Sequence, residues 1–62
     1  MVIKEYRKKR KLTILQFAEI MNVSTSTVKR WENKSYAPTM IEAIKICKEL
    51  NLPFMKLLKE YK

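Results

Sequence analysis

The chain has 62 residues, of which 47% are hydrophobic, and this length and content predict one globular domain over residues 1–62. It has 14 Lys and Arg against 6 Asp and Glu, which gives a net charge of +8. It has no histidine, no glycine and one cysteine, which excludes the usual zinc sites, glycine-rich phosphate loops and His-dependent triads, so we expect no enzyme, metal or cofactor. With no possible intrachain disulfide and no apolar run of signal or membrane length, we expect a cytoplasmic protein with a polyanionic partner.

Apolar residues recur at helical spacing and no useful stretch alternates with period two, so the chain is predicted to be all-α. Five helices are expected, over residues 2–10, 14–21, 25–32, 40–50 and 54–60.

Polar residues at the helix ends define these boundaries. Capping boxes, Thr13 with Gln16 and Thr39 with Glu42, open the second and fourth helices. Asn22 and Asn51 end them, since Asn tolerates the left-handed conformation in a chain without glycine. Ser24 caps the third helix and Pro53 precedes the fifth.

Three helices carry apolar stripes that we expect to be buried. The second has Ile14, Phe17, Ala18 and Met21; the fourth has Met40, Ala43, Ile44, Cys47 and Leu50; the fifth has Phe54, Leu57, Leu58 and Tyr61. Cys47 lies within its stripe, so we interpret it as a small buried hydrophobe rather than a reactive thiol.

The third helix follows the second after a corner of about three residues, a length typical of a helix-turn-helix. Its helical spacing turns Val28 and Trp31 toward the core. The opposite arc carries Thr25, Ser26, Lys29 and Arg30. Small hydroxyl side chains allow close approach to base edges, and Lys and Arg can donate to guanine O6 and N7, so this arc suits the major groove.

A solvated polar face without a function is the alternative interpretation of this arc. The charge distribution favours contact with the major groove instead. Residues 1–34 hold nine cations and three acids (9 − 3 = +6), whereas residues 35–62 hold five and three (5 − 3 = +2). The half that contains the corner is the more cationic one.

The segments "LTILQFAEIMNVSTSTVKRWEN" and "YAPTMIEAIKICKELNLPFMKLL" resemble the lambda-repressor-like helix-turn-helix family, the XRE or Cro-type regulators, over about residues 3–58. The matching positions are Leu12, Thr13, Phe17, Ala18, Val23, Ser24, Val28, Trp31, Glu32 and Pro38. The resemblance implies a five-helix fold whose third helix reads the major groove, usually as a homodimer on two half-sites. It assigns base contacts to the four residues of the outward arc.

The resemblance also implies phosphate contacts from the start of the second helix and the loop after the third. These positions are Thr13, Ile14, Asn33, Lys34 and Ser35. Ile14 stands where the family commonly has Gln, so that side-chain contact is absent, although backbone N–H groups at these positions could still donate. Lys11 and Lys34 stand where Gly is usual.

Arg7 and Glu32 occupy positions that this family often pairs. Arg7 lies beside the apolar side of the first helix, and Glu32 lies at the flank of the third helix's inward arc. We therefore expect a partly buried ion pair that holds the recognition helix.

The leading hypothesis is a sequence-specific double-stranded DNA-binding regulator, a small repressor of a phage or similar mobile element. It would bind a palindromic operator as a homodimer formed through the fifth helix, with no membrane and no small-molecule ligand as partner. A helix-turn-helix interaction module, such as an antitoxin or anti-repressor, is the alternative, with exposed Leu15, Ile20 and Met55 as its contacts. A cationic membrane-active protein is a third possibility, against which the capping boxes and the inward Trp31 argue.

Overall fold

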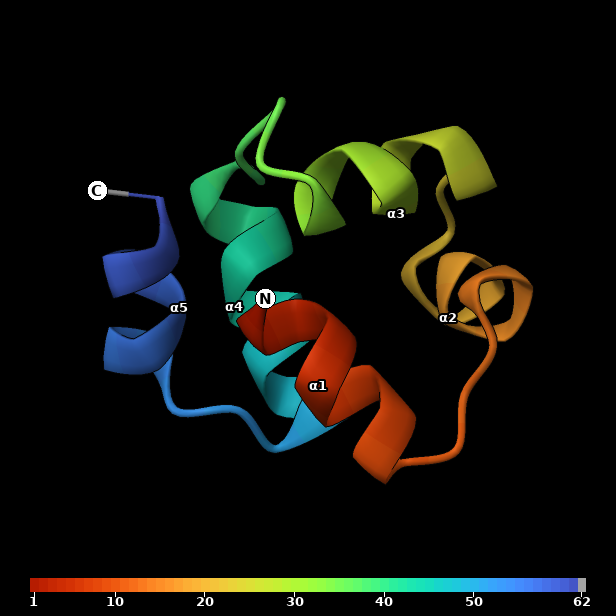
Figure 1. The fold of residues 1–62 in the computed structure, drawn as a ribbon, viewed down its shortest axis with the longest axis horizontal. Coiled ribbons are helices and arrows are strands. Elements are labelled where there is room, and N and C mark those ends of the chain that lie inside the picture. Colours follow the sequence, from red (N-terminus) through yellow and green to blue (C-terminus); the bar gives the residue numbers. More distant parts are fainter. Residues whose placement is uncertain (62) are drawn as a thin grey trace.

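The computed structural model describes residues 1–61, and over these residues it contains helices and no strand (Figure 1). The five helices are α1 (Val2–Lys9), α2 (Ile14–Met21), α3 (Thr25–Glu32), α4 (Met40–Leu50) and α5 (Phe54–Glu60). The predicted fold class is confirmed. Four helices have their predicted bounds, and α1 ends one residue early because Arg10 is its C-terminal cap.

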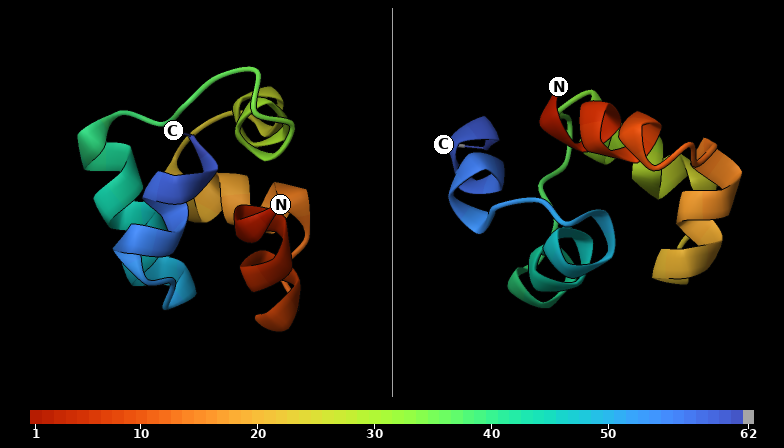
Figure 2. Two further views of the ribbon diagram at one scale, coloured as in Figure 1. Left: turned by 60° about the vertical axis from the view of Figure 1, so that its left-hand side comes forward. Right: turned by 90° about the horizontal axis from the view of Figure 1, so that it is seen from below.

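The helices are arranged between two ends of the molecule. α2 and α3 lie together at one end of the molecule and α5 lies at the other, with α1 and α4 between them (Figures 1 and 2). α3 packs against α2 and α1, whereas α5 packs against α4 and α1. α1 therefore connects the helix-turn-helix end of the molecule to its C-terminal helix.

Both predicted capping boxes are formed. Thr13 Oγ1 accepts from the Gln16 N–H at 3.0 Å, and Gln16 Oε1 accepts from the Thr13 N–H at 2.9 Å. The corresponding distances for Thr39 and Glu42 are 3.2 and 2.8 Å. Each box satisfies N–H groups that have no partner inside the helix.

Left-handed residues end several helices in this glycine-free chain. Asn22 and Asn51 have φ of 58° and 54°, which confirms both predicted helix ends. Lys11 and Lys34 also have positive φ, 57° and 64°. A lysine pays a steric penalty in this conformation because its Cβ crowds the following carbonyl oxygen, which explains why glycine is usual there.

One hydrophobic core lies under all five helices. Its fully buried large side chains are Trp31, Phe17, Ile3, Ile46, Leu50, Leu57 and Val28. The predicted α2 stripe is largely correct, since Phe17, Ala18 and Met21 are buried and Ile14 packs half-buried against the core.

The predicted α4 stripe is wrong in part. Met40 and Ile44 are 63% and 56% exposed, while Ile46, which the prediction omitted, is fully buried. Apolar residues occupy most of the α4 circumference, so the sequence offered two inward arcs, and packing against α1, α2 and α5 selects the arc of Ala43, Ile46 and Leu50.

Two smaller corrections concern the stripes of α4 and α5. Leu58 was predicted to be buried but is exposed, because α5 turns Leu57 toward the core instead. Cys47 is half-buried against the core rather than fully buried, and this partial burial raises the pKa of its thiol. A raised pKa disfavours the thiolate, in agreement with the interpretation of Cys47 as a packing residue.

The left-handed conformation of Lys11 predicts a stabilising substitution. Lys11→Gly removes the Cβ penalty and should raise the free energy of unfolding by about 0.5–1 kcal/mol after the larger entropy of the unfolded glycine is subtracted. The free energy of unfolding is measured by urea denaturation. Lys8→Gly, the same exchange inside α1, is the control and should lower stability by about 1 kcal/mol; loss of stability in both variants would contradict the assigned conformation.

Candidate nucleic-acid interface

A tight corner joins α2 to α3. α2 ends at left-handed Asn22, and the Val23 N–H turns back to donate to the Ala18 carbonyl oxygen at 3.0 Å. Ser24 then caps α3, where its Oγ accepts from the Thr27 N–H at 3.2 Å and lies 3.0 Å from Thr27 Oγ1. Residues 24–27 are therefore a helix start, and the hydroxyls of Ser24 and Thr27 belong to its cap.

The inward face of α3 anchors the helix in the core. Val28 and Trp31 are both 0% exposed, as predicted. The Trp31 ring meets Phe17 of α2 edge to face, with ring centroids 6.4 Å apart and an interplanar angle of 68°. Ala18 is buried at the same side of α2, and its small side chain lets α2 and α3 approach closely. These contacts fix the rotation of α3 about its axis.

The rotation leaves the predicted base-contacting side chains on the outside. Ser26, Lys29 and Arg30 are exposed, and Thr25 is partly exposed at the first turn of α3. Among residues 1–61, Lys29 and Arg30 form no ion pair and no side-chain hydrogen bond. Their charges are thus available to an external anion.

The start of α2 offers a different kind of contact. Ile14 is half-buried against the core, so its side chain is occupied by packing. The N–H groups of Ile14 and Leu15 belong to the first turn, where no preceding helical carbonyl can accept them. Together with the exposed Thr13 hydroxyl, they form the positive end of the α2 helix dipole.

The loop after α3 corrects one sequence-based expectation. Its backbone N–H groups were expected to be free for phosphate, but they donate internally: Asn33 to the Lys29 carbonyl at 3.0 Å, Lys34 to the Trp31 carbonyl at 3.3 Å, and Ser35 to the Arg30 carbonyl at 3.1 Å. The Ser35 N–H also donates to Asn33 Oδ1 at 2.9 Å. Only the exposed side chains of Asn33, Lys34 and Ser35 remain for external contacts.

Arg7 of α1 holds Glu32 at the C-terminal end of α3. Arg7 Nε donates to Glu32 Oε2 at 2.7 Å and Arg7 Nη2 donates to Glu32 Oε1 at 3.4 Å. Arg7 Nη1 donates to the Leu12 carbonyl oxygen at 2.7 Å, so the same guanidinium also fixes the turn before α2. The two side chains are only 7% and 9% exposed. This nearly buried fork joins α1, α3 and the approach to α2.

A second set of contacts reaches α3 from the end of α5. The Tyr61 hydroxyl donates to the Trp31 carbonyl oxygen. Glu60 Oε1 accepts from the Val2 N–H at 3.2 Å and lies 3.8 Å from Lys34 Nζ. Sequence reasoning missed both residues, since Tyr61 was assigned only to an apolar stripe and the partner of a hydroxyl depends on tertiary structure.

Metal-ligand clusters and membrane-spanning helices are both missing from the part of the chain that the structure describes. No group of three or more His, Cys, Asp or Glu side chains there could hold a metal ion. No helix there is long and apolar enough to cross a membrane.

The corner between α2 and α3, with a buried inner face and a cationic outer face on α3, defines a helix-turn-helix domain. The family model described as helix-turn-helix matches residues 3–57, and the chain therefore belongs to this XRE or Cro-type family of all-α DNA-binding domains. Comparison with curated proteins and with solved structures gave no match.

The buried fork predicts a large effect of removing Arg7. Arg7→Ala leaves the Glu32 carboxylate buried without its partner, which should cost roughly 3–5 kcal/mol. Thermal and urea unfolding, followed by circular dichroism, measure the loss. Lys8→Ala, an exposed neighbour on α1, should change stability little, and equal melting of the two variants would show that the pair is not structural.

The environment of Tyr61 predicts a pH dependence of stability. Burial, with the nearby Glu60 and Glu32 carboxylates, raises the pKa of Tyr61 from 10.0 to about 12. Because the folded pKa exceeds the unfolded one, the contribution is complete below pH 10 and is lost as the pH rises through about 12. The difference in unfolding free energy between wild type and Tyr61→Phe should therefore shrink over this range in urea titrations, and a constant difference would contradict the assignment.

Proposed function

We propose that this domain is a sequence-specific regulator that binds double-stranded DNA, acting as a small repressor with α3 in the major groove. The observation that supports this proposal is the outer face of α3, which presents Lys29 and Arg30 without an ion-pair partner among residues 1–61. The helix that carries them is anchored by Val28, Trp31 and Glu32. A rigid helix is needed because base-edge hydrogen bonds tolerate little misplacement.

The side chains of this face have complementary roles in the proposal. Lys29 and Arg30 donate to guanine O6 and N7, where Arg can make a bidentate pair. Thr25 and Ser26, at the start of the helix, contact base edges by hydroxyl hydrogen bonds, and the Thr25 methyl group can pack on a thymine methyl. The mixture predicts an operator with G·C pairs under the cationic turn.

Phosphate contacts fix the register of α3 in this proposal. At the start of α2, the N–H groups of Ile14 and Leu15 donate to a phosphate with the helix dipole behind them. The Thr13 hydroxyl, which accepts from the Gln16 N–H, keeps its own proton for a second donation. On the other side of α3, the side chains of Asn33, Lys34 and Ser35 contact the neighbouring backbone.

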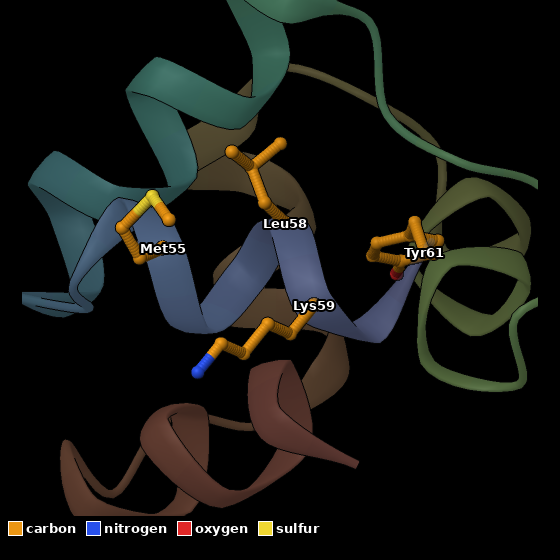
Figure 3. A pocket seen from close by; sticks show the side chains of 4 residues that line it. All are labelled: Met55, Leu58, Lys59 and Tyr61. Carbon is orange, nitrogen blue, oxygen red and sulfur yellow. The ribbon is translucent and has the colours of Figure 1, made fainter.

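The proposed regulator binds as a homodimer through α5. Met55 and Leu58 are 64% and 44% exposed on this helix, and they border an open pocket that also involves Lys59 and Tyr61 (Figure 3). A two-fold pair of chains would cover this apolar surface and present two α3 helices to half-sites about 34 Å apart.

A protein-interaction module is the second candidate. It is favoured by the exposure of Leu15 and Ile20 on α2, at 59% and 38%, together with Met55. An antitoxin or anti-repressor of this kind would use these apolar side chains on a protein partner. It would not need the cations of α3.

Selection from random duplex DNA, combined with charge removal, distinguishes the two candidates. The regulator should enrich a palindrome with half-sites one helical turn apart. On that sequence Arg30→Ala should cost about 1–3 kcal/mol of binding free energy and relax the preferred base. Lys29→Ala should also weaken binding, whereas Lys45→Ala, which removes the same charge from exposed α4, is the control and should have little effect.

The salt dependence of wild-type binding gives a second measure. If each chain neutralises about four to six phosphates, log K should fall with log salt by about 0.9 per phosphate. Failure to enrich any sequence, or equal binding by Arg30→Ala and Lys45→Ala, would exclude the regulator and favour the interaction module.

A further inference from the structure

Tyr61 belongs to two parts of the molecule at once. Its ring lines the pocket on α5 beside Met55 and Leu58. Figure 3 shows Tyr61 at the end of α5 that lies beside α3, apart from these two side chains. There its hydroxyl donates to the Trp31 carbonyl oxygen. One side chain therefore connects the outer surface of α5 to the backbone of the recognition helix.

The contact falls at the C-terminal end of α3, where Arg7 also holds Glu32. The last carbonyl groups of a helix have no partner inside it, and the Trp31 carbonyl is satisfied by the Lys34 N–H, at 3.3 Å, and by the Tyr61 hydroxyl. α3 packs as a helix against α2 and α1. The contacts between this end of the molecule and the end of α5 include this hydrogen bond and, just beyond α3, the approach of Lys34 to Glu60, at 3.8 Å.

We propose that Tyr61 is a positioning residue for DNA recognition, and that its hydroxyl fixes the C-terminal end of α3 against α5. This inference rests on the proposed function. Lys29 and Arg30 lie within the last turn of α3, next to the restrained carbonyl. A small shift of that turn misaligns their base contacts, whereas flexible contacts to phosphate tolerate it.

The two kinds of contact give the proposal a distinctive signature. Loss of the Tyr61 hydroxyl should weaken binding to the selected operator and leave binding to unrelated duplex DNA nearly unchanged. The salt slope on the operator should also stay constant, because the number of neutralised phosphates is the same. A residue that merely stabilises the fold would change both affinities in proportion, through the folded fraction.

The test compares Tyr61→Phe with Tyr6→Phe. Both variants remove a tyrosine hydroxyl that bonds to another part of the molecule, but the partner of the Tyr6 hydroxyl is Lys56 Nζ of α5, at 3.3 Å, and not the backbone of α3. Affinities for the selected operator and for a scrambled duplex are measured by fluorescence anisotropy, well below the melting temperature of every variant. The ratio of the two affinities should fall roughly threefold to tenfold in Tyr61→Phe, the loss expected for one hydrogen bond, and should stay at the wild-type value in Tyr6→Phe.

Hydrogen exchange without DNA gives an independent readout. In Tyr61→Phe the Lys34 amide, which shares the Trp31 carbonyl oxygen, should exchange faster, while amides in the middle of α2 keep their wild-type rates. If the ratio of the affinities for the operator and the scrambled duplex is the same in Tyr61→Phe as in the wild type, the positioning role alone is overturned. A wild-type chain that does not discriminate between the two duplexes would overturn the proposed function and, with it, the role of Tyr61 in recognition.

Discussion

The ion pair between Arg7 and Glu32 is the interaction on which the geometry of the recognition helix depends. Its guanidinium bridges the end of α3 and the Leu12 carbonyl before α2, with hydrogen bonds of 2.7 Å to each. Two nearly buried charges are costly to desolvate, and a buried pair is weak evidence of net stability. The pair does provide directional restraint, because the N–H groups of a guanidinium can donate to a carboxylate and a carbonyl at the same time in only a few geometries. In a domain of 62 residues, with no disulfide formed by its single cysteine, such restraint complements a small core.

The restraints on α3 are concentrated at its C-terminal end. Glu32 and the Trp31 carbonyl are held there by Arg7 and Tyr61, while the start of the helix is closed only by the Ser24 cap. Burial of Val28 and Trp31 sets the rotation of the helix. The hydroxyl-rich first turn is thus held by the Ser24 cap, while the cationic last turn is held by side chains from α1 and from the end of α5. This division suits a helix that approaches a groove with its first turn.

Much of this arrangement follows from local signals in the sequence. A hydroxyl with Gln or Glu three residues later opens α2 and α4, and Asn ends them, because caps involve neighbours in the chain. The inward position of Trp31 follows from helical spacing. The inner arc of α4 did not follow, since apolar residues cover most of that helix and only its neighbours decide between Ile44 and Ile46. The partner of the Tyr61 hydroxyl was inaccessible, because it depends on how separate helices come together. The loop N–H groups after α3, by contrast, donate to carbonyl oxygens of α3 itself, which is a local pattern of helix ends.

In the proposed function, the outer face of α3 and the start of α2 form the DNA-binding surface. Titration of the isotope-labelled domain with its selected duplex, followed by amide chemical shifts, tests this most directly. We expect the largest shifts on residues 13–15 and on Thr25, Ser26, Lys29 and Arg30. Shifts centred instead on the exposed apolar side chains of Ile41, Ile44 and Met55, with α3 unchanged, would contradict it.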